Sequence, residues 1–282
     1  MASILVVAVL AVMWALGERL AAHAIVDAPN AGQPVPEPVA GELRVATGPP
    51  EASIAYEVDG AQEPRATVLV LHGIRDSRAS MLGWASLLGG AGFRAVLVDL
   101  RGHGRSTGAT LSYGVFDARD LTRVLDDLEA RGLRVGHVGA LGVSYGAATA
   151  IEWAGADPRV ERVVAIAPFA SLAEVVPGYA PVSLPELFVR RSIALAGTMG
   201  GYDPALASPR DAITHTRAPV LLFHGVQDDR IPYWHSREIA AAAPDHAEVV
   251  LVDGANHDTV GEDPDLRRRA VSWLRALTPD AP

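Results

Sequence analysis

The sequence contains no cysteine, which excludes a thiol nucleophile, a disulfide bond and a thiolate metal site. Lysine is absent as well, because every basic residue other than histidine is an arginine. The chain therefore has no P-loop lysine, and it cannot form a Schiff base or a Ser–Lys dyad. Several classes of enzyme are excluded by these two absences alone.

Basic residues are also outnumbered by acidic ones, since the formal net charge is −9 and the isoelectric point is about 5.4. Affinity for nucleic acid comes mainly from clustered basic residues, so we expect no nucleic-acid partner. The chain has 282 residues, of which 49% are hydrophobic. This length and composition allow a full core within one α/β domain.

The N-terminus is apolar and uncharged over residues 2–17, and Glu18 and Arg19 end this run. At about 1.5 Å rise per residue the run is somewhat shorter than a hydrocarbon core of roughly 30 Å, although apolar residues beyond Arg19 extend it. We therefore predict that residues 1–26 form a transmembrane anchor and that the protein is membrane-associated. One alternative is a signal peptide with cleavage near Ala24, which would export and release the protein. A buried N-terminal helix is less favoured, because the segment is apolar on all sides and a linker follows it.

A proline-rich linker is predicted at residues 27–40, which contain four prolines, and a single domain at residues 41–279. In that domain, apolar runs alternate with amphipathic segments. This pattern predicts an α/β fold in which a mostly parallel sheet is flanked by helices, with a hairpin of two strands covering one edge. The strands are expected at 42–47, 54–58, 66–71, 94–98, 163–167, 220–223 and 249–252, and an amphipathic helix at 117–131.

A glycine-rich loop at residues 99–106 follows one of these strands. It could cradle a phosphate, but it lacks both the Rossmann spacing and the P-loop lysine. We expect a structural turn that Asp99 and Arg101 hold in place through charge-assisted hydrogen bonds.

The stretch 142–146 reads Gly-Val-Ser-Tyr-Gly and lies between an apolar run and a helix-forming segment. This context is typical of a nucleophile elbow, in which a serine occupies a strained turn and small residues two places away on either side prevent clashes. Ser144 is the candidate nucleophile. The backbone N–H of Tyr145 would point to the place where an oxyanion forms.

Two later strands are followed by loops that carry the partners such a serine needs. Asp228 and Asp229 follow the strand at 220–223, and His257 follows the strand at 249–252. A serine hydroxyl becomes a useful nucleophile only when a histidine takes its proton, and a carboxylate must orient that histidine. The order Ser, Asp, His is that of α/β-hydrolases, with either aspartate as the acid.

The sequence resembles the α/β-hydrolase superfamily over roughly residues 54–274, in particular the serine esterase, thioesterase and lysophospholipase branch. The resemblance rests on five motifs. They are His72-Gly73, Asp99-x-Arg101-Gly102-x-Gly104-x-Ser106, Gly142-x-Ser144-x-Gly146, His224-Gly225-x-x-Asp228-x-x-Ile231-Pro232 and Asn256-His257.

The resemblance implies a Ser144–His257–Asp228 triad, with the spacing of the fourth motif favouring Asp228 over its neighbour. It also implies an oxyanion hole formed by the N–H groups of Ile74 and Tyr145. His103 and His224 match motif positions that are structural in the family. No cofactor is implied, and we expect no metal site, because the remaining histidines lack metal-ligand spacing.

Substrate selection is expected from a small lid insertion at about residues 169–210. Its apolar side chains would suit an acyl chain or an aryl ester, with Tyr179, Leu187 and Phe188 as candidate substrate-binding residues. The alternative is that these side chains only seat the lid on the domain.

The resemblance thus implies a serine hydrolase that cleaves small-molecule carboxylic esters or thioesters through an acyl-enzyme. A peptidase or amidase of the same fold is the first alternative, and a non-catalytic, membrane-tethered binding module is the second. A complete triad favours an enzyme. The oligomeric state has no signal in the sequence.

Overall fold

The computed structural model describes residues 2–61, 63–134, 136–180 and 183–278. Residues 181–182 of the predicted lid and residue 279, the last of the predicted domain, lie outside the described residues. The strands are β1 (Glu42–Thr47), β2 (Ala52–Gly60), β3 (Ala66–Leu71), β4 (Phe93–Val98), β5 (Val138–Val143), β6 (Val160–Ile166), β7 (Val220–Gly225) and β8 (Ala247–Val252). The α-helices are α1 (Ala2–Val26), α2 (Leu82–Gly90), α3 (Asp117–Ala130), α4 (Tyr145–Ala156), α5 (Leu172–Val175), α6 (Glu186–Gly200), α7 (Pro209–Ala212), α8 (Trp234–Ala242) and α9 (Pro264–Leu274).

Within the described residues, eight strands form one sheet in the order β1-β2-β4-β3-β5-β6-β7-β8. β1 and β2 pair as an antiparallel hairpin at one edge, β2 pairs antiparallel with β4, and the pairs from β4 to β8 are parallel. The predicted mostly parallel sheet with an edge hairpin is therefore confirmed. The seven predicted strands lie within a few residues of their observed positions, and β5 is the apolar run that precedes the Gly-Val-Ser-Tyr-Gly stretch.

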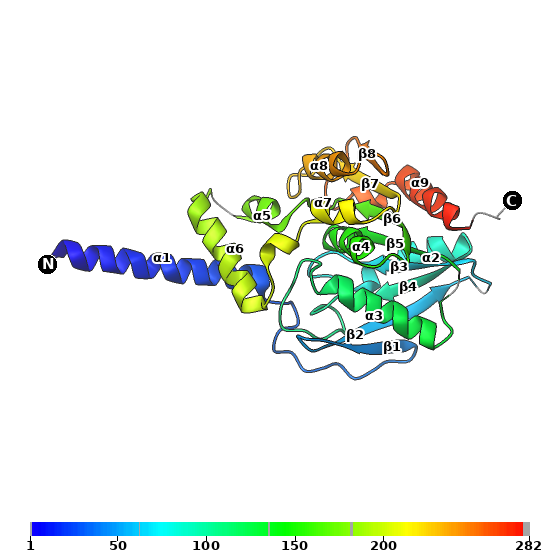
Figure 1. The fold of residues 1–282 in the computed structure, drawn as a ribbon, viewed down its shortest axis with the longest axis horizontal. Helices are drawn as coiled ribbons and strands as arrows, with labels where there is room; N and C mark the ends of the chain where they lie inside the picture. Colours follow the sequence, from blue (N-terminus) through cyan, green and yellow to red (C-terminus); the bar gives the residue numbers. More distant parts are fainter. Residues whose placement is uncertain (1, 62, 135, 181–182, 279–282) are drawn as a thin grey trace.

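Helices cover both faces of the sheet (Figure 1). On β3, which is fully buried, alternate residues point to opposite faces. Val68 and Val70 pack in the cluster that includes α2 and α9, whereas Leu69 and Leu71 pack in the cluster that includes α3 and α4. A continuous apolar run is what such a doubly covered strand requires.

The N-terminal helix α1 projects from the domain at its N-terminal end and runs into the domain at its C-terminal end (Figure 1). Ala22 and Val26 are fully buried in the main core cluster. The carbonyl oxygen of Ile25 accepts a hydrogen bond of 2.7 Å from the hydroxyl of Tyr113, and that of Val26 accepts one of 2.8 Å from the N–H of Leu111. The last turn of α1 is thus part of the folded core.

The predicted membrane localisation is wrong. None of the described helices is sufficiently long and apolar to span a bilayer. Glu18 lies in the middle of α1, where it is 5% exposed and forms an ion pair of 2.6 Å with Arg191 of α6. Both parts of the prediction, an anchor at residues 1–26 and release by cleavage near Ala24, treated this segment as separate from the domain, whereas α1 ends inside its core.

Residues 27–40, predicted as a linker, lie against the domain at several points. Asp27 forms an isolated β-bridge with Thr110, and Ala28 is 5% exposed. The side-chain amide of Asn30 donates to the carbonyl oxygens of Gly104 at 2.8 Å and Ser106 at 3.0 Å. These contacts connect α1 to the glycine-rich loop after β4.

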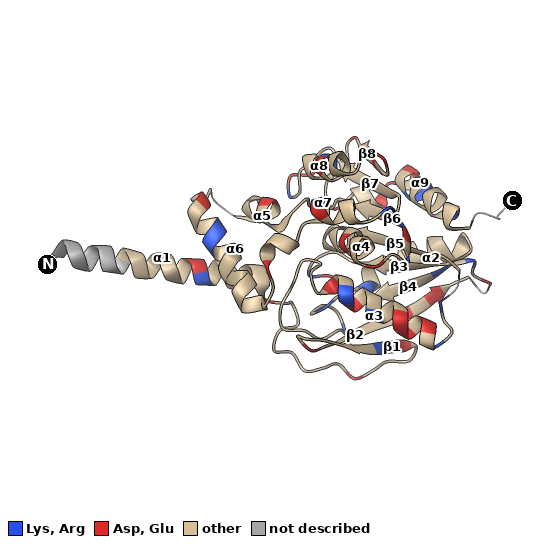
Figure 2. Cartoon of the chain, viewed as in Figure 1, with Lys and Arg blue, Asp and Glu red and all other residues tan. Residues whose placement is uncertain are grey.

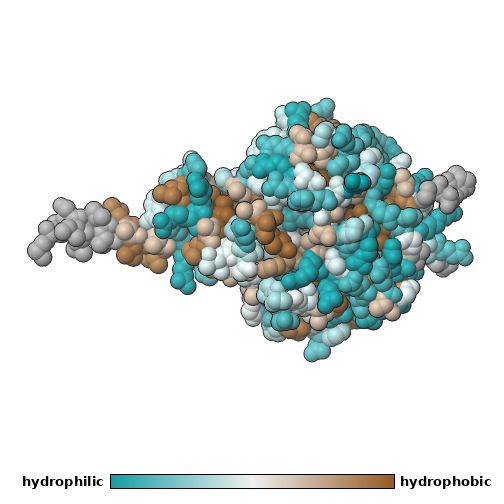
Figure 3. All heavy atoms as spheres, in the orientation of Figure 1, coloured by the Kyte–Doolittle hydropathy of each residue, from teal (hydrophilic) through white to brown (hydrophobic). Residues whose placement is uncertain are grey.

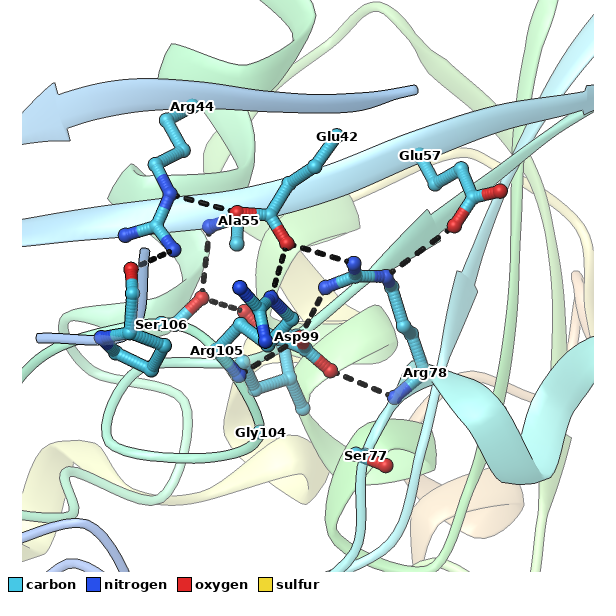
Figure 4. A network of polar contacts seen from close by, with 12 residues as sticks. Glu42, Arg44, Ala55, Glu57, Ser77, Arg78, Asp99, Gly104, Arg105 and Ser106 are labelled. Atoms are coloured by element: carbon cyan, nitrogen blue, oxygen red, sulfur yellow. Dashed lines mark hydrogen bonds and ion pairs between the residues drawn. The ribbon is translucent and has the colours of Figure 1, made fainter. Parts of the chain in front are cut away.

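A buried cluster of charges ties that loop to its neighbours (Figure 4). The carboxylate of Glu42, at the start of β1, accepts hydrogen bonds of 2.7 Å from Arg44 and 2.8 Å from Arg78, and it also pairs with Arg105. Arg78 pairs with Asp99 as well, and its N–H donates to the same carboxylate at 2.7 Å. The cluster joins three segments: β1, the turn after β3, and the loop after β4.

The prediction that Asp99 and Arg101 hold the 99–106 loop in place is confirmed. Asp99 accepts the N–H of Arg105 at 2.9 Å, and Arg101 forms two hydrogen bonds, of 2.7 and 2.8 Å, with the buried Asp120. This loop is therefore a structural turn held by charge-assisted hydrogen bonds.

Replacing Glu42 should destabilise the protein. In Glu42→Gln the arginines keep their charges beside a neutral amide, so we expect the free energy of unfolding at pH 7 to fall by about 2 kcal/mol. Urea unfolding measures this change. The exposed Glu63→Gln variant is the matched control, and its unfolding free energy should change by less than about 0.5 kcal/mol.

The loss of unfolding free energy in Glu42→Gln should depend on pH. Burial raises the pKa of Glu42, but the hydrogen bonds from Arg78, Arg44 and Arg105 outweigh burial and lower it below its ordinary value of 4.5. A carboxylate with a lowered folded-state pKa stabilises the fold above its unfolded pKa, and this stabilisation disappears as the pH falls through the folded value. The difference between wild type and Glu42→Gln should therefore shrink below about pH 4.5. A difference that stays constant in acid would contradict this account.

Candidate active site

Ser144 occupies the turn between β5 and α4 with a strained backbone, φ 53° and ψ −114°. Residues other than glycine rarely adopt a positive φ, so the surrounding structure must hold the backbone of Ser144 in this conformation. A Cβ atom at Gly146 would lie 2.5 Å from the carbonyl oxygens of Leu71 and His72, and one at Gly142 would lie 2.2 Å from the carbonyl oxygen of Gly146. Only glycine allows these close approaches, which fix the turn against β3.

The three residues predicted to act together are hydrogen-bonded in series. Ser144 Oγ lies 3.0 Å from Nε2 of His257, and Nδ1 of His257 lies 2.6 Å from Oδ2 of Asp228. With its Nδ1–H donating to Asp228, the imidazole leaves Nε2 free to accept the serine proton. This is the arrangement in which a histidine can act as a general base toward a serine.

Asp228 is held in place from several sides. Its Oδ1 accepts the N–H groups of Ile231 at 2.9 Å and Arg230 at 3.1 Å, and its side chain is fully buried. Burial raises the pKa of this carboxyl, but hydrogen bonds from His224 and His257 outweigh burial and hold the pKa well below its ordinary value. The carboxylate thus stays ionised. Asp229, the other predicted candidate, is exposed.

His257 lies in a loop that Asn256 shapes. The side-chain oxygen of Asn256 accepts the N–H groups of Asp258 at 3.0 Å and Thr259 at 3.1 Å, and the Thr259 hydroxyl oxygen accepts the N–H of Asn256 at 3.0 Å. These bonds close a tight turn after β8 that directs His257 toward Ser144.

The predicted oxyanion-hole residues, Ile74 and Tyr145, both line the cavity onto which Ser144 opens. The N–H of Tyr145 belongs to the first turn of α4, where N–H groups have no partner within the helix. The phenol of Tyr145 donates to Asp117 at 3.0 Å and accepts the N–H of Tyr113 at 3.0 Å, which fixes the residue at both ends.

The turn that carries Ile74 is fixed by His72. Its Nδ1 lies 2.7 Å from the carbonyl oxygen of Gly73, and its Nε2 accepts the N–H of Leu100 at 3.0 Å. Burial and the nearby His103 lower the pKa of His72 to about 4, so the ring is neutral and can both donate and accept. Each of these histidines is buried and serves the loop structure.

The cavity beside Ser144 has a volume of about 510 Å³. Of the predicted substrate-binding residues, Tyr179 and Phe188 line it, whereas Leu187 is 62% exposed and is not among its lining residues. Successive helical residues differ by about 100° in direction, so one of two neighbours on α6 faces the cavity and the other faces solvent.

Several other residues that line this cavity are not among the predicted substrate-binding residues. Three of them lie on α1, namely Ala21, Ala24 and Ile25. Their spacing of three and four residues is the only sequence signal that could have indicated a common face. That signal lies in the segment interpreted as a membrane anchor.

A second cavity of about 450 Å³ opens on the other side of Ser144. Its lining is more polar and includes His257, Arg230, Asp258 and Glu262. Tyr179 borders both cavities. No cluster of three or more potential metal ligands occurs in the described part of the chain.

Comparison with known proteins places the chain in a family. A family model described as serine aminopeptidase, S33, matches residues 62–207, just over half of the chain. The uncharacterized protein YqkD of Bacillus subtilis is 29% identical over 178 residues, which cover 59% of this chain and 56% of YqkD. The uncharacterized protein Rv2307c of Mycobacterium tuberculosis is 30% identical over 200 residues, which cover 71% of this chain and 64% of that protein. The chain thus spans less than two thirds of these relatives.

Solved structures share the fold. The esterase Pf2001 of Pyrococcus furiosus superposes with a TM-score of 0.68 at 19% identity, covering 88% of this chain and 98% of the esterase. A 2,6-dihydroxy-pseudo-oxynicotine hydrolase superposes with a TM-score of 0.65 at 17% identity, covering 89% of this chain and 70% of that one. The predicted α/β-hydrolase fold is confirmed, and the chain belongs to the α/β-hydrolase family described as serine aminopeptidase, S33.

Proposed function

We propose that the protein is a serine hydrolase that cleaves carboxylic esters or thioesters through an acyl-enzyme intermediate. The observation that carries this proposal is the series of hydrogen bonds from Ser144 through His257 to the buried Asp228, located where an apolar cavity meets a polar one. In this proposal Ser144 is the nucleophile, His257 the general base and Asp228 the orienting acid.

The geometry supports a two-step reaction. Oγ of Ser144 attacks the carbonyl carbon of the substrate while Nε2 of His257 takes the hydroxyl proton, and Asp228 stabilises the imidazolium that results. The N–H groups of Ile74 and Tyr145 stabilise the oxyanion. Collapse of this intermediate breaks the bond to the alcohol or thiol, which leaves with the proton from His257. Water then attacks the acyl-enzyme in the same way and releases the acid.

The two cavities support an assignment of the two halves of the substrate. The apolar cavity would hold the acyl part against Tyr179 and Phe188, and the more polar cavity would hold the leaving group. We also propose that residues 169–210 act as the lid of a catalytic domain spanning 41–279.

An amidase or peptidase is the second candidate, because the matching family model is described as a serine aminopeptidase. An aminopeptidase needs a group that binds the ammonium of its substrate. Among the described residues that line the apolar cavity, none is acidic and Arg75 is cationic. This lining favours an uncharged group in the apolar cavity, and the acidic groups available to an ammonium, such as Asp258 and Glu262, line the polar cavity. Parallel assays with esters, thioesters and peptide amides decide between the two candidates.

The nucleophile can be tested directly. Because only an activated serine reacts quickly with a fluorophosphonate, the wild-type protein should be labelled at Ser144, and Ser144→Ala should lose both labelling and ester turnover. Mass spectrometry of the labelled peptide identifies the site. Ser272→Ala changes an exposed serine on α9 and is the control that should keep both. Labelling that persists in Ser144→Ala would refute the assignment, and an unlabelled wild type would favour a non-catalytic protein.

The acid can be distinguished from its neighbour. Asp228 is buried and bonded to His257, whereas Asp229 is exposed. Asp228→Asn should therefore reduce kcat by about 10⁴-fold, the loss seen when the orienting carboxylate of such a triad is replaced, and Asp229→Asn should reduce it by less than about 3-fold. Steady-state kinetics on one ester gives both values. The opposite ranking would move the acid to Asp229.

The proposed chemistry uses no metal and no cofactor. Ester hydrolysis should therefore survive dialysis against EDTA with less than about a 2-fold change in rate, because the nucleophile and base are side chains. An EDTA-treated sample that loses activity and regains it with a divalent cation would contradict the mechanism.

A further inference from the structure

The wall of the apolar cavity opposite the lid helix comes from the N-terminal helix. Ala21, Ala24 and Ile25 of α1 line the same cavity as Ser144. Residues three and four apart lie on one face of a helix, so this face of α1 is turned toward the candidate nucleophile. No residue before position 72 carries a catalytic role in the proposed reaction, so this contribution is separate from the triad.

The C-terminal end of α1 is fixed relative to the triad. Tyr113 donates its phenol proton to the carbonyl oxygen of Ile25 at 2.7 Å, and its own N–H donates to the phenol oxygen of Tyr145 at 3.0 Å. Tyr113 thereby connects the last turn of α1 to the residue that follows Ser144. Tyr113 therefore links the position of the wall to that of the nucleophile elbow.

The middle of α1 packs against α6, which is the element it contacts most extensively (Figure 1). The rings of Trp14 and Phe188 meet edge to face with centroids 5.2 Å apart. A Cβ atom at Gly17 would lie 3.3 Å from the Phe188 ring, so the glycine lets the two helices approach closely. The two helices therefore form adjoining parts of the cavity wall.

Charge distribution fits an apolar occupant. Figure 2 shows that charged residues lie mostly on the body of the domain, and Figure 3 shows apolar side chains exposed along α1 and α6. Glu18, a buried charge where the two helices cross, forms an ion pair with Arg191 at 2.6 Å and accepts the indole N–H of Trp14 at 2.6 Å. The ion pair joins the helices without placing a charge in the cavity lining.

We propose that α1 is the acyl-chain wall of this enzyme, and that the small side chains of Ala21 and Ala24 leave room for an extended aliphatic acyl chain lying between α1 and α6. The substrate class is then an ester or thioester of a long unbranched acyl chain, with its leaving group in the polar cavity. This inference rests on the proposed function, because the chain must be attached at the carbonyl that Ser144 attacks. Burial of each methylene against this wall supplies the selectivity for length.

The test fills the space beside α1. In Ala21→Phe the added ring should occupy the path of a long chain, so the ratio of kcat/KM for p-nitrophenyl laurate to that for p-nitrophenyl butyrate should fall at least 10-fold. Ala15→Phe is the matched control, because Ala15 is an exposed alanine of the same helix that does not line the cavity. It should change the ratio by less than 2-fold. Circular dichroism and thermal unfolding check that each variant is folded.

A second variant and a binding measurement separate this proposal from the proposed function. Ala24→Leu, at a more exposed position of the same wall, should lower the same ratio and replaces Ala21→Phe if that variant does not fold. Calorimetric titration with laurate, with butyrate as reference, measures chain binding without catalysis, and Ala21→Phe or Ala24→Leu should weaken laurate binding at least 10-fold.

Active variants with an unchanged chain-length ratio and unchanged laurate binding would overturn the role of α1 and leave the triad intact. A different result is that the wild type binds laurate more tightly than Ala21→Phe or Ala24→Leu does, yet hydrolyses no ester. That result would refute the proposed function and support the role of α1 as the acyl-chain wall. If the wild type neither binds laurate nor prefers long-chain esters, the proposal that α1 is an acyl-chain wall is refuted.

Discussion

Close backbone contact at the elbow is the constraint on which the rest of the site depends. Gly146 lets the start of α4 come within van der Waals limits of the end of β3, and Gly142 lets β5 pass beneath the first turn of α4. The same contact places Gly73 beside Ser144, because a Cβ atom added at Gly73 would lie 3.7 Å from the Cβ of Ser144. A side chain at Gly142 or Gly146 would push the nucleophile away from the turn that carries Ile74, because its Cβ would lie 2.2 or 2.5 Å from a backbone oxygen.

The elements predicted correctly are those whose signals are local. β3 is a continuous apolar run that needs helices on both faces, and α3 repeats apolar residues on one side, so each could be recognised within a single window of the sequence. The proximity of Ser144, Asp228 and His257 followed from topology, because the loops at the carboxyl ends of parallel strands meet at one edge of the sheet.

The features that could not be predicted are contacts between residues far apart in the sequence. Glu18 reads as a charge that interrupts an apolar run, and only the structure shows its partner, Arg191, on another helix. The same holds for Glu42, whose carboxylate is shared by arginines from three segments. Hydropathy alone therefore predicts a membrane anchor at residues 1–26, and only the structure shows that one face of α1 lines the cavity.

The pairing of α1 with α6 also orders the events of folding. The two helices are separated by about 160 residues of sequence, and this separation includes most of the central sheet. During synthesis α1 leaves the ribosome before α6, so its packing surface is complete only after α6 has been made. Until then Glu18 lacks its partner Arg191, and the face of α1 that contacts Phe188 remains in water. A contact between segments this far apart has a high cost in loop-closure entropy, and pairing of the strands between them lowers that cost.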